Sequence, residues 1–178
     1  KTFNINCIKN DFSIISDICK KWKKKPIQFH IMSKNPLKYI KRNLVENCNI
    51  KTIFVHDNIE NLKGIKNKIL EIGSEPGIVI SPKNYKSKIN IALLKEYNEI
   101  LLLCIKKPGE SGQEQKPNIH KYVDKLNLIK KKYKIKVTVD GGINISNIGM
   151  IKSDNFVSSS YIMNSDKPSE VINKLKLI

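Results

Sequence analysis

Several signals that would assign a chain to a common class are missing from this sequence. No apolar run approaches the length needed to cross a bilayer, and nothing at the start resembles a signal peptide. We therefore expect neither contact with a membrane nor secretion. The chain begins with Lys1 rather than Met, which we interpret as processing or truncation.

Closely spaced cysteines are missing too. The four cysteines contain no C-x-x-C pair and are widely separated: Cys7, Cys19, Cys48 and Cys104. Such residues are typical of small buried core positions. We expect free thiols in a reducing compartment, either the cytoplasm or an organelle interior.

Arginine is almost absent, although the formal net charge is +17 and Arg42 is accompanied by many lysines. Selected phosphate and base contacts favour arginine because its guanidinium binds in a bidentate way. Lysine, isoleucine and asparagine together make almost half of the chain, which indicates an AT-rich coding sequence. We interpret the charge as solvated helix faces, so a nucleic-acid partner is considered but not favoured.

Strand and helix patterns alternate throughout, and strong β-hairpin signals are absent. This alternation predicts a parallel α/β fold, in one domain over residues 1–178. Seven strands are expected, at 3–8, 27–32, 51–56, 77–82, 99–105, 135–140 and 155–158. Helices are expected at 13–25, from 35 to about 45, and at 59–72, 90–95, 118–132, 144–152 and 167–177.

The stretch 135–143 is the most informative segment. It reads as a strand covered on both faces that ends in Asp140, followed by Gly141 and Gly142. The C-terminal end of a strand is where α/β barrels place catalytic groups. Glycines there let backbone approach a ligand, although a plain glycine turn would have the same sequence.

With these residues in view, the chain resembles the ribulose-phosphate 3-epimerase family. The resemblance rests on four pieces: 29–32 with 35–36 and Tyr39, Val55-His56, the proline-glycine loop 108–113, and 139–144. It implies a TIM (β/α)8-type parallel barrel, here lacking the family's first strand and helix. It also implies one divalent metal (zinc, iron or manganese) held by two histidines and two aspartates. The two aspartates are also implied to move the proton.

Family roles transfer by position. His30 matches a metal histidine, and Asp140 matches a metal ligand that is also one acid/base group. Met32 matches a methionine beneath the substrate. The remaining matches are implied to bind substrate or its phosphate: Gly112, Gly141, Gly142, Ser159 and Ser160.

The sequence differs from the family at positions that the family's chemistry uses. Asn4 stands where the resemblance implies the first metal histidine, and Asn6 where it implies the partner aspartate. An amide does not take up a proton at neutral pH and binds metal less well than a carboxylate. Ser159 replaces a glycine of the phosphate loop, and Glu110 brings negative charge close to it. His56 matches a strand-end histidine of the family but lacks the glutamate that follows it there.

We therefore expect a family member that is impaired or inactive as an epimerase and is retained for a structural or assembly role, with metal weakly bound or absent. One alternative is an active, divergent epimerase that converts D-ribulose 5-phosphate to D-xylulose 5-phosphate in the pentose phosphate pathway. Another is a basic subunit of a larger complex, RNA included. Homo-oligomers are considered as well. With the first strand missing, strands 3–8 and 155–158 are expected to present open edges. The alternatives are that an N-terminal piece is missing from the chain, that a partner chain fills the slot, or that the two edges pair directly into a smaller closed barrel.

Overall fold

The structure is a computed structural model of the chain and describes residues 12–22, 24–41 and 48–178. The chain divides into two compact units, Lys1–Val79 (unit 1) and Ile80–Ile178 (unit 2), which are described separately. The expected strand at 3–8 lies outside the described residues. None of the helices in the described ranges combines the length and apolarity that crossing a membrane requires.

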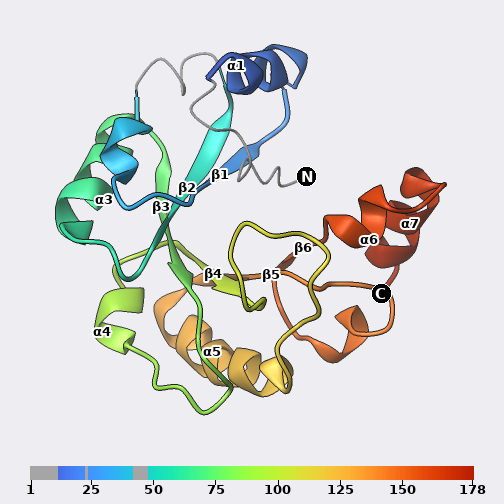
Figure 1. Ribbon diagram of the computed structural model, residues 1–178. Helices are drawn as coiled ribbons and strands as arrows, with labels where there is room; N and C mark the ends of the chain where they lie inside the picture. The colour runs from blue at the N-terminus through green and yellow to red at the C-terminus, as the bar shows by residue number, and fades with distance from the viewer. Residues whose placement is uncertain (1–11, 23, 42–47) are drawn as a thin grey trace. The chain divides into compact units, whose positions relative to one another are not determined.

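Unit 1 contains parallel strands that pair in the order of the sequence. Its described elements are α1 (Phe12–Lys21), β1 (Ile27–Ile31), the 3-10 turn η1 (Pro36–Lys38), β2 (Ile50–His56), α3 (Leu62–Glu71) and β3 (Glu75–Ile80). β1 pairs with β2, and β2 with β3. α3 lies beside β3 (Figure 1), and its Ile65 and Ile69 are buried. β2 and β3 are buried along most of their length, as parallel strands covered on both sides are.

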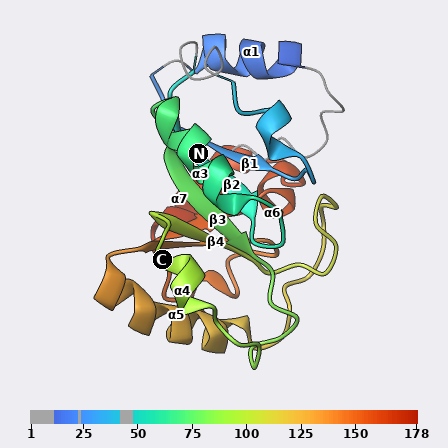
Figure 2. The same cartoon turned by 90° about the vertical axis from the view of Figure 1, so that its left-hand side faces the viewer.

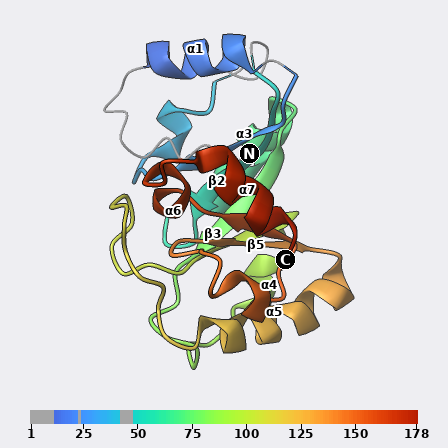
Figure 3. The ribbon, with the colours of Figure 1, turned by 90° about the vertical axis from the view of Figure 1, so that its right-hand side faces the viewer.

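Unit 2 repeats this pattern. Its elements are α4 (Ile91–Leu94), β4 (Glu99–Leu103), α5 (Ile119–Tyr133), β5 (Lys136–Asp140), the 3-10 turn η2 (Ile148–Met150), β6 (Asn155–Val157), α6 (Ser160–Met163) and α7 (Pro168–Lys176). β4 pairs with β5 and β5 with β6, all parallel. α5 packs against β5, α4 and α5 lie on the same side of β4 (Figure 2), and α6 lies beside α7 (Figure 3).

Six of the seven predicted strands are confirmed, and two predicted helices are corrected. The helix expected from residue 35 is a single 3-10 turn in its described part. The helix expected at 144–152 is only η2. There Asn144 Oδ1 accepts from the Ser146 N–H, and Asn147 Oδ1 accepts from the Asn144 N–H. These side-chain bonds satisfy backbone donors locally and so compete with helix formation.

The expectation of free thiols is wrong for two of the cysteines. Cys19, near the end of α1, is bonded to Cys48, just before β2, with a Cα–Cα distance of 4.8 Å. Both are buried, and they are separated by 29 positions, so no local motif announces the pairing. Cys104 is free and buried, as expected. The compartment itself remains a prediction.

Candidate active site

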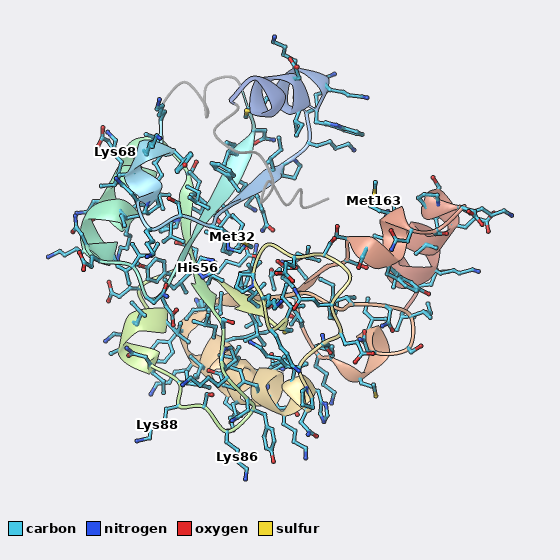
Figure 4. The ribbon with its side chains drawn as sticks, in the orientation of Figure 1. Met32, His56, Lys68, Lys86, Lys88 and Met163 are labelled. Atoms are coloured by element: carbon cyan, nitrogen blue, oxygen red, sulfur yellow. A yellow bond between two sulfur atoms is a disulfide. The ribbon has the colours of Figure 1, made fainter. Side chains whose placement is uncertain are left out.

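Two imidazoles meet at the ends of neighbouring strands in unit 1. His30 lies in β1 and His56 ends β2, as Figure 4 shows for His56, and their Nε2 atoms are 2.9 Å apart. Burial, together with the neighbouring His56, lowers the pKa of His30 to about 3, and burial also lowers the pKa of His56. At neutral pH the pair is therefore uncharged, with one Nε2 donating its proton to the other.

His30 has one further nitrogen. Its Nδ1 is buried and has no hydrogen-bond partner among the described residues. Met32, which follows β1, is half-buried.

The described residues do not by themselves form a metal site. Within the described ranges, no three histidine, cysteine, aspartate or glutamate side chains gather as metal ligands would. Unit 1 offers the two imidazoles of His30 and His56, and their Nε2 atoms already bond each other. Catalytic metal sites usually take three protein ligands. We therefore derive no step through a metal.

Asp140 is a buried carboxylate at the C-terminal end of a strand of unit 2. It closes β5, is only 7% exposed, and burial raises its pKa to about 6. A carboxyl group with such a pKa changes protonation close to physiological pH, as a general acid or base does. The catalytic role that the resemblance implies for Asp140 remains a prediction.

The two glycines after Asp140 make room for protein backbone and side chains. Both have positive φ, +104° for Gly141 and +68° for Gly142. A Cβ on Gly141 would lie 2.6 Å from Ile105 Cγ2, and one on Gly142 would lie 2.6 Å from the backbone nitrogen of Gln115. In this structure the approaching atoms belong to the segment after β4, and close approach of the backbone to a ligand remains a prediction.

Two glutamines hold that segment in place. The Gln113 side-chain amide accepts from the Lys107 N–H and donates to the carbonyls of Lys107 and Glu110, at 2.6–3.0 Å. The Gln113 side chain therefore bonds the backbone of the proline-glycine loop to which it belongs. Gln115 Nε2 donates to the Gly141 carbonyl at 3.2 Å, which joins this segment to the end of β5.

A cavity of about 720 Å³ lies beside this loop in unit 2. Its lining includes three of the predicted substrate positions, Gly112, Gly142 and Ser160. The rest of the lining is rich in amides and hydroxyls, with one carboxylate: Gln113, Glu114, Gln115, Ile143, Asn144, Asn147, Tyr161, Asn164, Ser165 and Val171. Such a lining suits a polar, oxygen-rich ligand.

Of the other predicted positions, Ser159 does not line this cavity. Ser159 precedes α6, and its carbonyl accepts from the N–H groups of Ile162 and Met163. Asn4 and Asn6 lie outside the described residues. The roles implied for all three remain predictions.

The sequence did not single out the residues that shape the loop. Gln115, Asn144 and Asn147 have no distinctive spacing, and asparagine is common along the whole chain. Asn144 Nδ2 and Asn147 Nδ2 both donate to the Gly142 carbonyl, at 3.3 and 2.8 Å. The available signal was their position just after a glycine pair, where polar side chains often bond the backbone.

Replacing Asp140 by asparagine should stabilise the fold at neutral pH. Because burial raises the pKa of Asp140 from 3.8 to about 6, its contribution is most favourable at low pH and is lost as pH rises through 6. The amide stays neutral, so Asp140→Asn should gain roughly 2–3 kcal/mol at pH 8 and little at pH 4. Urea unfolding followed by circular dichroism at both pH values measures this. An equal difference at the two pH values would contradict it.

Sequence comparison identifies relatives along most of the chain. The model of the "Ribulose-phosphate 3 epimerase family" matches residues 5–163. Ribulose-phosphate 3-epimerase of Aquifex aeolicus is 30% identical over 145 residues, covering 79% of this chain and 62% of that protein. The enzyme of the same name from Escherichia coli is 27% identical over 159 residues, covering 85% and 68%. The chain thus spans less than two thirds of the length of the Aquifex relative.

Solved structures show the fold. 3-Hexulose-6-phosphate synthase matches with a TM-score of 0.62 at 13% identity, over 93% of this chain and 79% of that one. The tryptophan synthase α-subunit of Pyrococcus furiosus matches with a TM-score of 0.64 at 15% identity, over 94% and 72%. Parallel strands and these neighbours confirm the TIM-barrel fold class. By the match over residues 5–163, the chain belongs to the ribulose-phosphate 3-epimerase family.

Proposed function

We propose that this chain is an epimerase-family protein in which epimerisation of ribulose 5-phosphate is lost or strongly impaired, and which is retained for a structural or assembly role. The observation that carries the proposal is the His30–His56 contact of 2.9 Å between Nε2 atoms. His30 is the position where the family resemblance implies a metal histidine. Here Nε2 of His30 is used within a neutral imidazole pair, which leaves only Nδ1 of that ring without a partner among the described residues.

The proton chemistry supports the same conclusion. Epimerisation at one carbon needs one group to remove a proton and a second to return it on the opposite face. Asp140 supplies a buried carboxyl group with a pKa of about 6. The partner position is Asn6, whose amide does not accept a proton at neutral pH. The chain therefore offers half of the required pair.

Two observations favour a second candidate, an active and divergent epimerase. The pKa of Asp140 suits a general base, and the cavity in unit 2 brings together Gly112, Gly142 and Ser160. In that case Asp140 would act with a group other than an aspartate at position 6. Binding of a sugar phosphate in the cavity is compatible with both candidates.

A coupled assay of ribulose 5-phosphate epimerisation, with elemental analysis of the same preparation, separates the two. We expect a rate near background and no stoichiometric zinc, iron or manganese. Asp140→Asn is the matched control because it keeps the side chain's size and removes its base. An active epimerase would show a rate that Asp140→Asn lowers by 100-fold or more, and that result would overturn the proposal.

A further inference from the structure

Lysines gather around one tyrosine on the surface of unit 2. Lys121 Nζ lies 5.2 Å and Lys86 Nζ 5.9 Å from the centre of the Tyr85 ring. Lys125 Nζ donates to the Tyr85 carbonyl at 2.9 Å. We call these four residues the Tyr85 cluster. Its three lysines are exposed and its tyrosine is half-buried.

Acidic side chains do not neutralise this cluster. Elsewhere in unit 2 lysines pair with carboxylates, as in Lys130–Asp154 and Lys167–Glu170. Among the described residues, the lysines of the Tyr85 cluster form no such ion pair, not even with Asp124 on the same helix. Within the described part of the chain, no carboxylate is therefore paired with these lysines.

The helix beneath the cluster adds to the positive potential. Lys121 lies in the first turn of α5, and that turn contains no acidic residue. The N-terminal end of a helix carries partial positive charge, so a lysine there is unfavourable for the helix itself. This arrangement costs fold stability, and a bound anion would offset the cost.

A short turn presents the tyrosine. The Ser87 N–H donates to the Asn84 carbonyl at 3.1 Å, and the Lys86 N–H donates to Asn84 Oδ1 at 2.9 Å. Exposed Lys83 and Lys88 flank the turn and continue the positive strip. Figure 4 shows Lys86 and Lys88 projecting outward from unit 2. The turn holds a ring and several ammonium groups on one stretch of surface.

We propose that the Tyr85 cluster binds single-stranded nucleic acid, with backbone phosphates at the lysines and a base against the Tyr85 ring. Positive grooves with an aromatic platform are how proteins bind single strands without sequence preference. Lysine binds phosphate as a point charge, which places few demands on geometry. Residues 83–88 present no aliphatic side chain that would insert into a lipid surface, so a membrane fits less well.

Fluorescence anisotropy with a labelled 20-nucleotide single-stranded RNA tests this on the full chain. The test variant carries Lys86→Gln, Lys121→Gln and Lys125→Gln. The control variant loses the same charge at exposed lysines of unit 2: Lys152→Gln, Lys174→Gln and Lys176→Gln. Thermal unfolding checks that both remain folded, and Tyr85→Leu tests the ring separately.

We expect the test variant to bind at least tenfold more weakly at 50 mM salt, while the control changes less than twofold. Three lost phosphate contacts should also reduce the slope of log affinity against log salt by about 2. Equal weakening in both variants would show non-specific attraction and overturn the proposal. So would undetectable RNA binding by the unchanged chain, or tight binding to phosphatidylserine vesicles alone. Epimerase activity enters none of these measurements, so the outcome is independent of the proposed function.

Discussion

Replacing Cys48 by serine should lower the free energy of unfolding by roughly 3–4 kcal/mol. The Cys19–Cys48 disulfide links positions 29 apart in sequence and therefore limits the freedom of the unfolded chain. The loop-closure relation gives this magnitude for such a separation. Both cysteines are also buried, so the new hydroxyl would lack water. Urea unfolding monitored by the fluorescence of Trp22, the single tryptophan of the chain, reports directly on unit 1.

A dithiol reductant provides the internal control. The unchanged chain should lose stability when reduced, Cys48→Ser should show no further loss, and Cys104→Ser should respond as the unchanged chain does. Cys104 is suited to this comparison because it is a buried free thiol in unit 2. Titration that finds every cysteine reactive in the native, unreduced protein would contradict the bond.

Replacing Gly142 by alanine should be nearly as damaging, at roughly 3 kcal/mol or more. The residue has φ of +68°, which costs a non-glycine residue about 1 kcal/mol or more. The added Cβ would lie 2.6 Å from the Gln115 backbone nitrogen, so the segment after β4 would have to move. We expect a fall in stability together with disturbance of the cavity that Gly142 lines.

Gly112→Ala is the matched control for this prediction. Gly112 also has positive φ, +76°, and lines the same cavity, but nothing lies within 4 Å of its would-be Cβ. Gly112→Ala should therefore lower the free energy of unfolding only by the cost of positive φ, about 1 kcal/mol. Urea unfolding of both variants measures the difference. Equal losses for Gly112→Ala and Gly142→Ala would show that the close approach of Gln115 is unimportant.

The strands were predictable because their signal is local and strong. The run at 135–140 is rich in β-branched residues, and β5 was found there at Lys136–Asp140. Burial on both faces of a parallel strand leaves this pattern in any sequence. The prediction of a helix at 144–152 was wrong because Asn144 and Asn147 bond the backbone of their own loop. The spacing of apolar residues along the sequence does not show such hydrogen bonds between side chain and backbone.

The candidate site was partly predictable for a different reason. Family resemblance indicated His30, Asp140 and Gly142, which are residues of strand ends and their turns. It did not indicate that His56 would bond the His30 imidazole, because that contact joins two strands. The Cys19–Cys48 bond was missed for the same physical reason. Contacts between segments distant in sequence depend on packing, which single-residue patterns do not contain.

Pairing of strands in sequence order bears on how quickly the chain can fold. Ile27 pairs with Ile50 in unit 1, and Thr138 pairs with Asn155 in unit 2. Loop-closure entropy rises with the length of chain between paired segments, and low contact order accompanies fast folding. Each unit can therefore form its first strand pair across a short connection.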